Sequence, residues 1–318
     1  MPINCTAANT RCYGGSMSFS GLFSHYRSKQ LQLLLLLLLT QASVLAQRSS
    51  GAEGLELVLG VGGTYFSGDL GADGPTSIDG NTSGAAFQGG LRYHITNRVA
   101  VRGTFAYAQV KGFDSLSSSQ YRKQRNLDFK SNVFGFAATL EYSLLNWNFR
   151  NGRTAQKKYI TKKQNLYVFA GVSIMTFRPY GSLYGQWYSL PELSTAGQGL
   201  PGGPSEYKLN TLAIPIGAGY KYLLGRGISL GAELVFNKTF TDDMDDVSAS
   251  YYNNTSLRQL KGDIAAEIAD KNRFPGGIKR PGGEPRGNPS STDNYSVLYI
   301  TLNIKLKGSK RGDACYAF

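Results

Sequence analysis

The feature that most constrains this chain is an alternation of apolar with small or polar residues, which begins near residue 54 and recurs to the end. In GLELVLGVGGTYFSG (54–68), leucine and valine occupy alternate positions, with glutamate and glycine between them. Because successive side chains of a β-strand point to opposite faces, this pattern predicts strands with one apolar and one polar face. Eight segments carry it, near residues 54–68, 85–95, 99–110, 127–145, 166–177, 211–224, 228–240 and 295–307, although the facing of 166–177 is ambiguous.

The connections between these segments differ in length. Two are tight, at 96–98 and 225–227, one at 146–165 is intermediate, and four are long, near 69–84, 111–126, 178–210 and 241–294. Short turns at one end and long loops at the other are typical of a transmembrane barrel with an even number of strands. The predicted fold is therefore all-β: an eight-stranded antiparallel up-and-down transmembrane β-barrel with long extracellular loops and short periplasmic turns.

A soluble lipocalin-like barrel is the alternative, and it would turn its large apolar side chains inward. Here the residues opposite the apolar face are glycine, threonine, arginine and glutamate on several strands, which favours a lipid-facing exterior. The aromatic residues also fall into two groups, as the two interfaces of a bilayer select. The first group lies toward the long loops and the second toward the short turns: Tyr65, Phe87, Phe105, Tyr107 and Phe236, and Tyr93, Tyr142, Tyr220 and Tyr222.

The first 46 residues have the character of a secretory signal peptide. Arg27 and Lys29 precede a leucine-rich core, and Ala46 occupies the last position before a plausible cleavage site. Met17 is an alternative start. We expect residues 47–318 to form a single barrel domain in the outer membrane, with both termini in the periplasm. Only Cys315 lies in this mature part, so a disulfide framework is not expected.

Charged residues also occur on the face that the barrel would enclose. They comprise three acids and four bases, all in the half nearest the short turns: Glu56, Arg92, Arg102, Glu141, Lys221, Glu233 and Lys305. Because eight strands enclose an interior that side chains just fill, and because buried charges are tolerated when paired, these residues predict an ion-paired plug. A proton or ion path is the alternative.

Catalytic signals are weak. His94 is the one histidine of the mature chain, and no serine or carboxylate stands at a spacing that selects it as a partner. There is no phosphate-binding loop, Cys or His metal pattern, or nucleophile elbow. The formal charge of +13 could suggest nucleic acid, but the leader argues against it. We expect no enzyme activity, no cofactor, no nucleic acid and no small-molecule substrate, with a lipid-modifying enzyme as a minor alternative.

The segment TFTDDMDDVSASYYNN (239–254) is rich in carboxylates and opens the longest loop. Its acids lack the spacing of an EF-hand loop. They predict a hydrogen-bonded loop base, and a calcium site at Asp242, Asp245 and Asp246 is the less favoured alternative. Further along, SLRQLKGDIAAEIADK (256–271) predicts a short amphipathic helix with Ser256 as its N-cap.

The connection 146–165 is strongly basic and contains no acid. Its cations are Arg150, Arg153, Lys157, Lys158, Lys162 and Lys163. The barrel topology would put them in the periplasm. They indicate either a solvated hairpin that touches anionic lipid or a docking face for a periplasmic partner, and the residues alone leave both possibilities open.

Several motifs occur in an order that resembles the PorG-like outer-membrane proteins of the type IX secretion system, among them FSGDLGADGP, RYHITNRVAVR, QWYSLPELSTAGQG and NKTFTDDMDDVSASYY. The resemblance runs from about residue 54 to the end. It implies an eight-stranded barrel that is not an enzyme and that links the outer membrane to a periplasmic ring, built by a PorK-like lipoprotein and its PorN-like partner. It favours the docking role of the basic connection. A generic OmpA-like structural barrel is the alternative.

Overall fold

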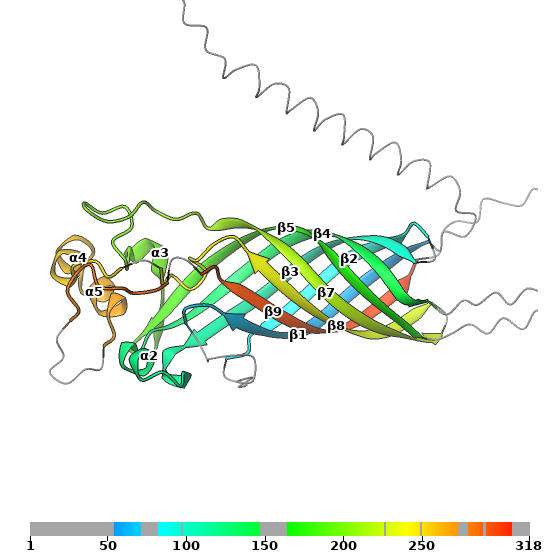
Figure 1. Ribbon diagram of the computed structural model, residues 1–318, viewed down its shortest axis with the longest axis horizontal. Coiled ribbons are helices and arrows are strands. Elements are labelled where there is room, and N and C mark those ends of the chain that lie inside the picture. Colours follow the sequence, from blue (N-terminus) through cyan, green and yellow to red (C-terminus); the bar gives the residue numbers. More distant parts are fainter. Residues whose placement is uncertain are drawn as a thin grey trace, which may run out of the picture. The chain divides into compact units, whose positions relative to one another are not determined.

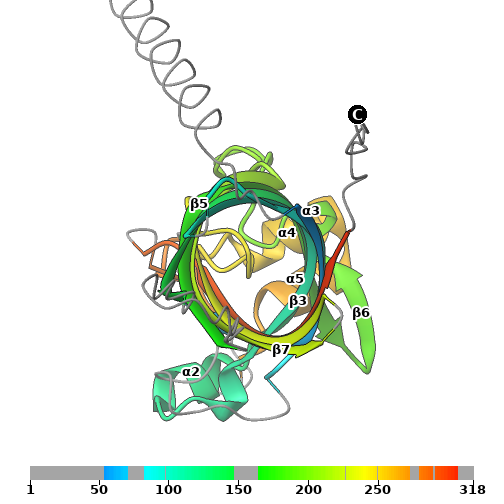
Figure 2. The same cartoon turned by 90° about the vertical axis from the view of Figure 1, so that its right-hand side faces the viewer.

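A computed structural model describes residues 54–70, 82–96, 98–146, 164–225, 227–248, 250–272, 279–288 and 291–306. The predicted signal peptide and the six cations of the basic connection lie outside these residues. Eight long strands form one antiparallel sheet in the order β4-β3-β2-β1-β9-β8-β7-β5, and the pairing of β4 with β5 closes it (Figures 1 and 2). They are β1 (Leu55–Ser67), β2 (Ala85–His94), β3 (Val99–Phe113), β4 (Asp128–Asn146), β5 (Gln164–Leu183), β7 (Asn210–Gly225), β8 (Ile228–Thr239) and β9 (Asn294–Lys305).

Every strand of the barrel pairs with its neighbours in the sequence, except that β9 also pairs with β1 to complete the ring. This is the predicted eight-stranded up-and-down topology, and the structure confirms it. A short extra strand, β6 (Gln186–Ser189), pairs only with the end of β5 and forms a hairpin outside the ring. The prediction of residues 166–177 for the fifth barrel strand was therefore too short, because β5 continues past the barrel into this hairpin.

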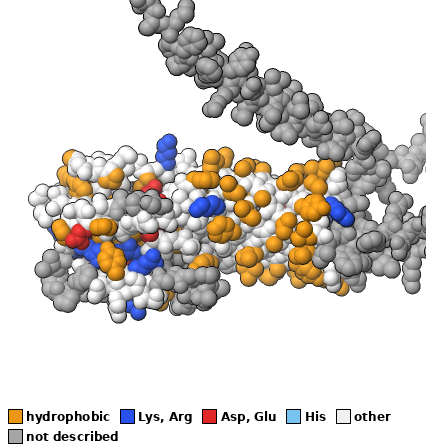
Figure 3. All heavy atoms as spheres, viewed as in Figure 1, with side chains coloured by type: hydrophobic (Ala, Val, Ile, Leu, Met, Phe, Trp, Pro, Cys, Tyr) orange, Lys and Arg blue, Asp and Glu red, His pale blue; other side chains and the backbone are white. Residues whose placement is uncertain are grey.

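The outer face of the barrel is apolar. Large side chains alternate outward along each strand, and several are more than half exposed, such as Phe136 at 61% and Val172 at 65%. The space-filling view shows apolar side chains gathered over the barrel, and charged ones mainly toward the long-loop end (Figure 3). Soluble monomeric proteins rarely expose so large a continuous apolar surface to water. Such a surface is typical of the outward face of a barrel that contacts the hydrocarbon of a bilayer. No helix among the described residues is long and apolar enough to span a membrane.

The barrel interior has two halves. Near the short turns, its side chains are charged. Near the long loops, aromatic and aliphatic side chains fill it, and Phe66 packs edge to face on Phe129 with ring centroids 4.7 Å apart. Tyr295 and Tyr299 also belong to this buried cluster. The prediction of a small and polar interior therefore holds for one half only, because strands at the long-loop end carry apolar residues on both faces.

The long loops fold back over one end of the barrel, and we refer to residues 114–127, 184–209 and 240–293, as far as they are described, as the loop cap (Figure 1). The cap contains η1 (Asp114–Leu116), α2 (Gln120–Arg125), α3 (Leu190–Leu193), α4 (Asn254–Lys261) and α5 (Asp263–Ala269). Where one helix was predicted over 256–271, there are two, because Gly262 adopts φ +90° between them. The N-cap is Asn253 rather than Ser256, and its side chain accepts a hydrogen bond from the Ser256 N–H at 2.9 Å.

Candidate functional site

Six of the seven charged residues predicted to face the interior meet in one cluster near the short turns. We call this cluster the interior ion network: Glu56, Arg92, Arg102, Glu141, Lys221 and Glu233. Its members come from β1, β2, β3, β4, β7 and β8, so that it joins walls on all sides of the barrel. Alternation places each side chain inward, and the antiparallel register places them at similar depth.

Arg92 stands at the centre of the network and is fully buried. Its guanidinium contacts three carboxylates: Glu56 at 2.9 Å, Glu141 at 2.6 Å and Glu233 at 3.3 Å. It also donates to the Asn303 side-chain oxygen at 2.8 Å. The planar fork of arginine, with five N–H donors, suits such a position better than lysine would.

The remaining cations complete the pairing. Arg102 contacts Glu141 at 2.9 Å and Glu233 at 2.7 Å, and Lys221 contacts Glu56 at 2.8 Å. The network thus holds three carboxylates and three cations, and its formal charge is zero. Such a balanced and hydrogen-bonded group is the arrangement in which buried charges are tolerated.

Lys305, the seventh predicted member, does not belong to the network. It is the last residue of β9, and although it pairs in register with Glu56, its side chain is exposed at the barrel end. A strand-end position gives the ammonium of a long lysine access to water.

Uncharged residues that the sequence did not single out also support the network. The Tyr167 hydroxyl donates to Glu233, the Gln88 side chain donates to Glu233 at 3.1 Å, and the Arg92 guanidinium lies 5.0 Å from the centre of the Tyr167 ring. Gly219 pairs with both Tyr167 and Glu233 in the sheet. A Cβ at Gly219 would lie 2.4 Å from the Tyr167 ring, so only glycine leaves room for it there.

Little space remains beside the network. Within the barrel, a cavity of about 50 Å³ lies between the charged and the aromatic halves, and Arg102, Thr104 and Phe169 contribute to its lining. This volume accommodates one or a few water molecules. Among the described residues, side chains therefore fill most of the interior at the depth of the network.

His94 lies at the edge of the network. Its Nε2 atom is 3.2 Å from Oε2 of Glu56, and the side chain is largely buried. The contacts of Glu56 go to Arg92 and Lys221 as well. No hydroxyl nucleophile contacts His94 among the contacts of the described residues. The geometry places His94 as a partner of the ion network.

In the loop cap, Asp246 is a second buried charge with several partners. Its carboxylate accepts hydrogen bonds from the hydroxyls of Tyr207 at 2.7 Å and Thr195, and from the Gln198 side chain at 3.4 Å. Arg286 contacts the same carboxylate at 3.3 Å and also donates to the Asp246 backbone carbonyl. Asp246 thus joins two long loops.

Arg125 makes a comparable junction between three loops. It contacts both oxygens of Asp114, at 2.7 and 2.8 Å, and donates to the backbone carbonyls of Arg286 at 2.6 Å and Asp69 at 2.8 Å. One guanidinium thus connects the long loops that contain Asp69, Asp114 and Arg286. The cap is an ordered structure with buried ionic junctions, which agrees with the prediction of a hydrogen-bonded loop base.

The alternative calcium site at Asp242, Asp245 and Asp246 is not assembled. Asp246 adopts φ +63° and turns its carboxylate toward Arg286, whereas Asp245 turns the other way and accepts from the backbone N–H groups of Leu70 at 3.0 Å and Val247 at 2.8 Å. Among the described residues, no group of three or more His, Cys, Asp or Glu side chains is arranged to hold a metal ion.

Asp245 instead forms an acidic cluster with Asp242, Asp293 and Asp69. Burial, with repulsion among these carboxylates, raises the pKa of Asp245 and of Asp293 well above the ordinary value of aspartate. Burial first, and then the neighbouring Asp69 and Asp243, raise the pKa of Asp242 to about 7. The folded loop therefore favours the protonated form of these acids.

This cluster predicts that the loop cap becomes less stable as the pH rises. An acid whose pKa is raised on folding binds more protons in the folded state, so its stabilising contribution is lost between the ordinary pKa near 4 and the folded value. For Asp242 that window is about pH 4 to 7. Hydrogen exchange at residues 242–248, corrected for intrinsic rates, should show more frequent opening at pH 8 than at pH 5.

The matched variants for this experiment are Asp242→Asn and Glu284→Gln. Asparagine cannot ionise, so Asp242→Asn should reduce the difference in opening frequency between pH 5 and pH 8. Glu284 is exposed in the same loop, so Glu284→Gln should leave that difference unchanged. Opening that increases toward pH 5 in the unchanged protein would contradict the assignment.

The chain was compared with protein families, curated proteins and solved structures. A family described as "Domain of unknown function (DUF6089)" matches residues 29–186. No curated protein matches the chain. Among solved structures, Neisserial surface protein A has 12% identity and a TM-score of 0.36, over 81% of this chain and 100% of its own.

Two further solved structures give similar values. Ail, the attachment invasion locus protein of Yersinia pestis, has 12% identity and a TM-score of 0.36, over 80% of this chain and 99% of its own. The outer membrane protein OprG from Pseudomonas aeruginosa has 13% identity and a TM-score of 0.36, over 81% of this chain and 98% of its own. By its own closed sheet and apolar exterior, the present chain has the fold of an eight-stranded outer-membrane β-barrel.

Proposed function

We propose that this barrel is an outer-membrane component of a type IX protein secretion system, and that it links the membrane to a periplasmic ring by protein contacts. The observation that carries the proposal is the filled interior. A neutral plug of paired charges at one end and an aromatic core at the other leave the two ends of the barrel as the surfaces for function.

The end with the short turns is the proposed docking face. β4 ends at Asn146 and β5 begins at Gln164, at the same barrel end as the tight turns between β2 and β3 and between β7 and β8. Both strands that flank the basic connection 146–165 therefore have their ends there. We place this end and both termini in the periplasm, the long loops outside the cell, and a PorK-like ring lipoprotein with its PorN-like partner against the cations Arg150, Arg153, Lys157, Lys158, Lys162 and Lys163.

Charge reversal tests this function. A variant with glutamate at Lys157, Lys158, Lys162 and Lys163 should lose most crosslinking to the ring lipoprotein in outer membranes and should impair secretion, because opposite charges steer and orient such contacts. A control for position reverses two lysines, Lys123 and Lys261, which are exposed in the loop cap at the other end. Equal secretion by both variants would support a generic OmpA-like structural barrel instead.

A lipid-modifying enzyme is the second candidate, since His94 lies beside a carboxylate in the barrel. The contacts of His94 favour a structural role. A His94→Ala variant that folds and leaves lipid A unaltered, with secretion intact, excludes catalysis at this residue. A change in lipid A composition would favour the enzyme.

A further inference from the structure

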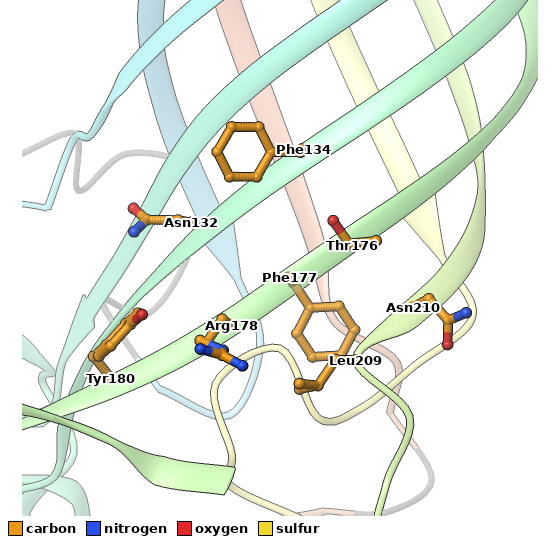
Figure 4. A pocket seen from close by; sticks show the side chains of 8 residues that line it. All are labelled: Asn132, Phe134, Thr176, Phe177, Arg178, Tyr180, Leu209 and Asn210. Carbon is orange, nitrogen blue, oxygen red and sulfur yellow. The ribbon is translucent and has the colours of Figure 1, made fainter. Parts of the chain in front are cut away.

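The outer wall of the barrel carries a groove at the long-loop end. It has a volume of about 480 Å³ and lies where β4, β5 and the start of β7 meet. Its lining combines apolar, amide and cationic side chains: Asn132, Phe134, Thr176, Phe177, Arg178, Tyr180, Leu209 and Asn210 (Figure 4). None of these residues belongs to the interior ion network.

The groove stands where the lipid-facing wall becomes polar. Along β5 the outward positions are Val172 and Ile174, exposed at 65% and 64%, followed by Thr176 and Arg178, which are also exposed. Arg178 is four residues beyond Ile174, or about 13 Å of strand. A position just past the apolar belt is the depth of lipid headgroups.

Two lysines extend this cationic surface over the neighbouring strands. Lys111 of β3 and Lys130 of β4 are directly opposite in register, and Arg178 pairs with Asn132, two residues along the same face from Lys130. The Lys130 ammonium lies 4.2 Å from the centre of the Trp187 ring. Like charges placed directly opposite in a sheet destabilise it, so their presence calls for a compensating anion.

The described residues supply no such anion. Asp128 is the nearest acid on this face of β4, and it is ion-paired with Lys271. Neither Arg178 nor either lysine forms an ion pair within the described part of the chain. An anionic group from outside the chain would neutralise these three cations, and a phosphate would accept charge-assisted hydrogen bonds from Arg178.

We propose that the groove binds the phosphorylated headgroup of a membrane lipid in the leaflet at the long-loop end. The phosphate contacts Arg178, with Lys130 and Lys111 beside it. The acyl chains lie along the apolar wall below, beginning at Phe134. Which leaflet this is depends on the orientation of the barrel, and the proposed function places the long loops outside the cell. In that orientation it is the outer leaflet, and the ligand is a phosphorylated glycolipid of the lipid A type.

Binding of lipid A to the purified barrel in detergent, measured by native mass spectrometry, tests this site. Each cation near a lipid phosphate contributes on the order of tenfold or less, so the Lys130→Gln and Arg178→Gln double variant should bind roughly 10- to 30-fold more weakly. The matched control is Lys123→Gln with Lys261→Gln, which removes the same charge from exposed positions in the loop cap. Folding of each variant is checked by its mobility on gels without heating.

Dephosphorylated lipid A provides the second arm. It should bind the unchanged barrel as weakly as lipid A binds the double variant. Equal loss in the test and control variants, or equal binding of the dephosphorylated lipid, would overturn the proposal. The experiment uses no secretion readout, so its failure is distinct from a failure of the docking function at the opposite end.

Discussion

Replacement of Glu233 by alanine should destabilise the barrel by about 3–5 kcal/mol, because it leaves buried cations without a partner. Glu233 is fully buried and contacts Arg102 at 2.7 Å and Arg92 at 3.3 Å, and it accepts from Tyr167. After the change, two carboxylates would face three cations. The fraction of folded barrel in phospholipid vesicles, followed by gel mobility across a urea series, measures the loss.

Two companion variants separate charge imbalance from lost packing. Glu284→Ala removes an exposed acid from the loop cap and should leave the urea midpoint unchanged. Arg102→Met combined with Glu233→Gln removes one charge of each sign and restores the balance, so its cost should be below the sum of the two single changes. If Glu233→Ala unfolds at the same urea concentration as Glu284→Ala, the plug does not contribute to stability.

The barrel wall could be predicted from the sequence because the signal is local. A strand with one apolar face repeats every second residue, and β1 shows this repeat without interruption. Strand β5 lacks this signal. Tyr167 and Phe169 point inward while Val168 and Val172 point outward, so both faces are apolar. Only the pairing of β5 with β4 and β7 determines its facing.

The composition of the interior ion network was also predictable, but its pairing was not. Alternation alone places Glu56 and Arg92 inward, and they are neighbours in the β1–β2 register. The contact between Arg92 and Glu233 joins residues 141 positions apart across the closed barrel, which no local pattern encodes. Lys305 has the alternation of an inward residue, but its side chain is exposed because β9 ends there.

The loop cap was the least predictable part, since its contacts depend on three-dimensional closure. The chemistry of Asp246 arises from residues between 39 and 51 positions away in the sequence: Thr195, Gln198, Tyr207 and Arg286. The sequence predicts a hydrogen-bonded loop base for this cluster of aspartates but does not identify the partners. Folding divides the carboxylates between Arg286 on one side and backbone N–H groups on the other. Buried carboxylates in a loop therefore act here as structural acceptors.

Replacement of Arg286 by methionine should open the loop cap and leave the barrel folded. Arg286 is buried and donates to both the carbonyl and the carboxylate of Asp246, so its loss leaves a buried carboxylate without its cation. Breaking such a buried pair costs about 3–5 kcal/mol. We expect this cost to lower the free energy of local opening of the loops that the pair joins. Hydrogen exchange should increase at residues 242–248 and 195–207, the segments that meet at Asp246.

The folded state of the barrel shows whether this opening is confined to the loop cap. Gel mobility without heating should match that of the unchanged protein, because the interior ion network and the strand pairing do not include Arg286. Lys123→Met, at an exposed position of α2, is the control and should leave exchange in both segments unaltered. Combining Arg286→Met with Asp246→Asn removes the unpaired charge and should recover part of the protection. Unaltered exchange in Arg286→Met would show that neutral hydrogen bonds to Asp246 hold the cap without its cation.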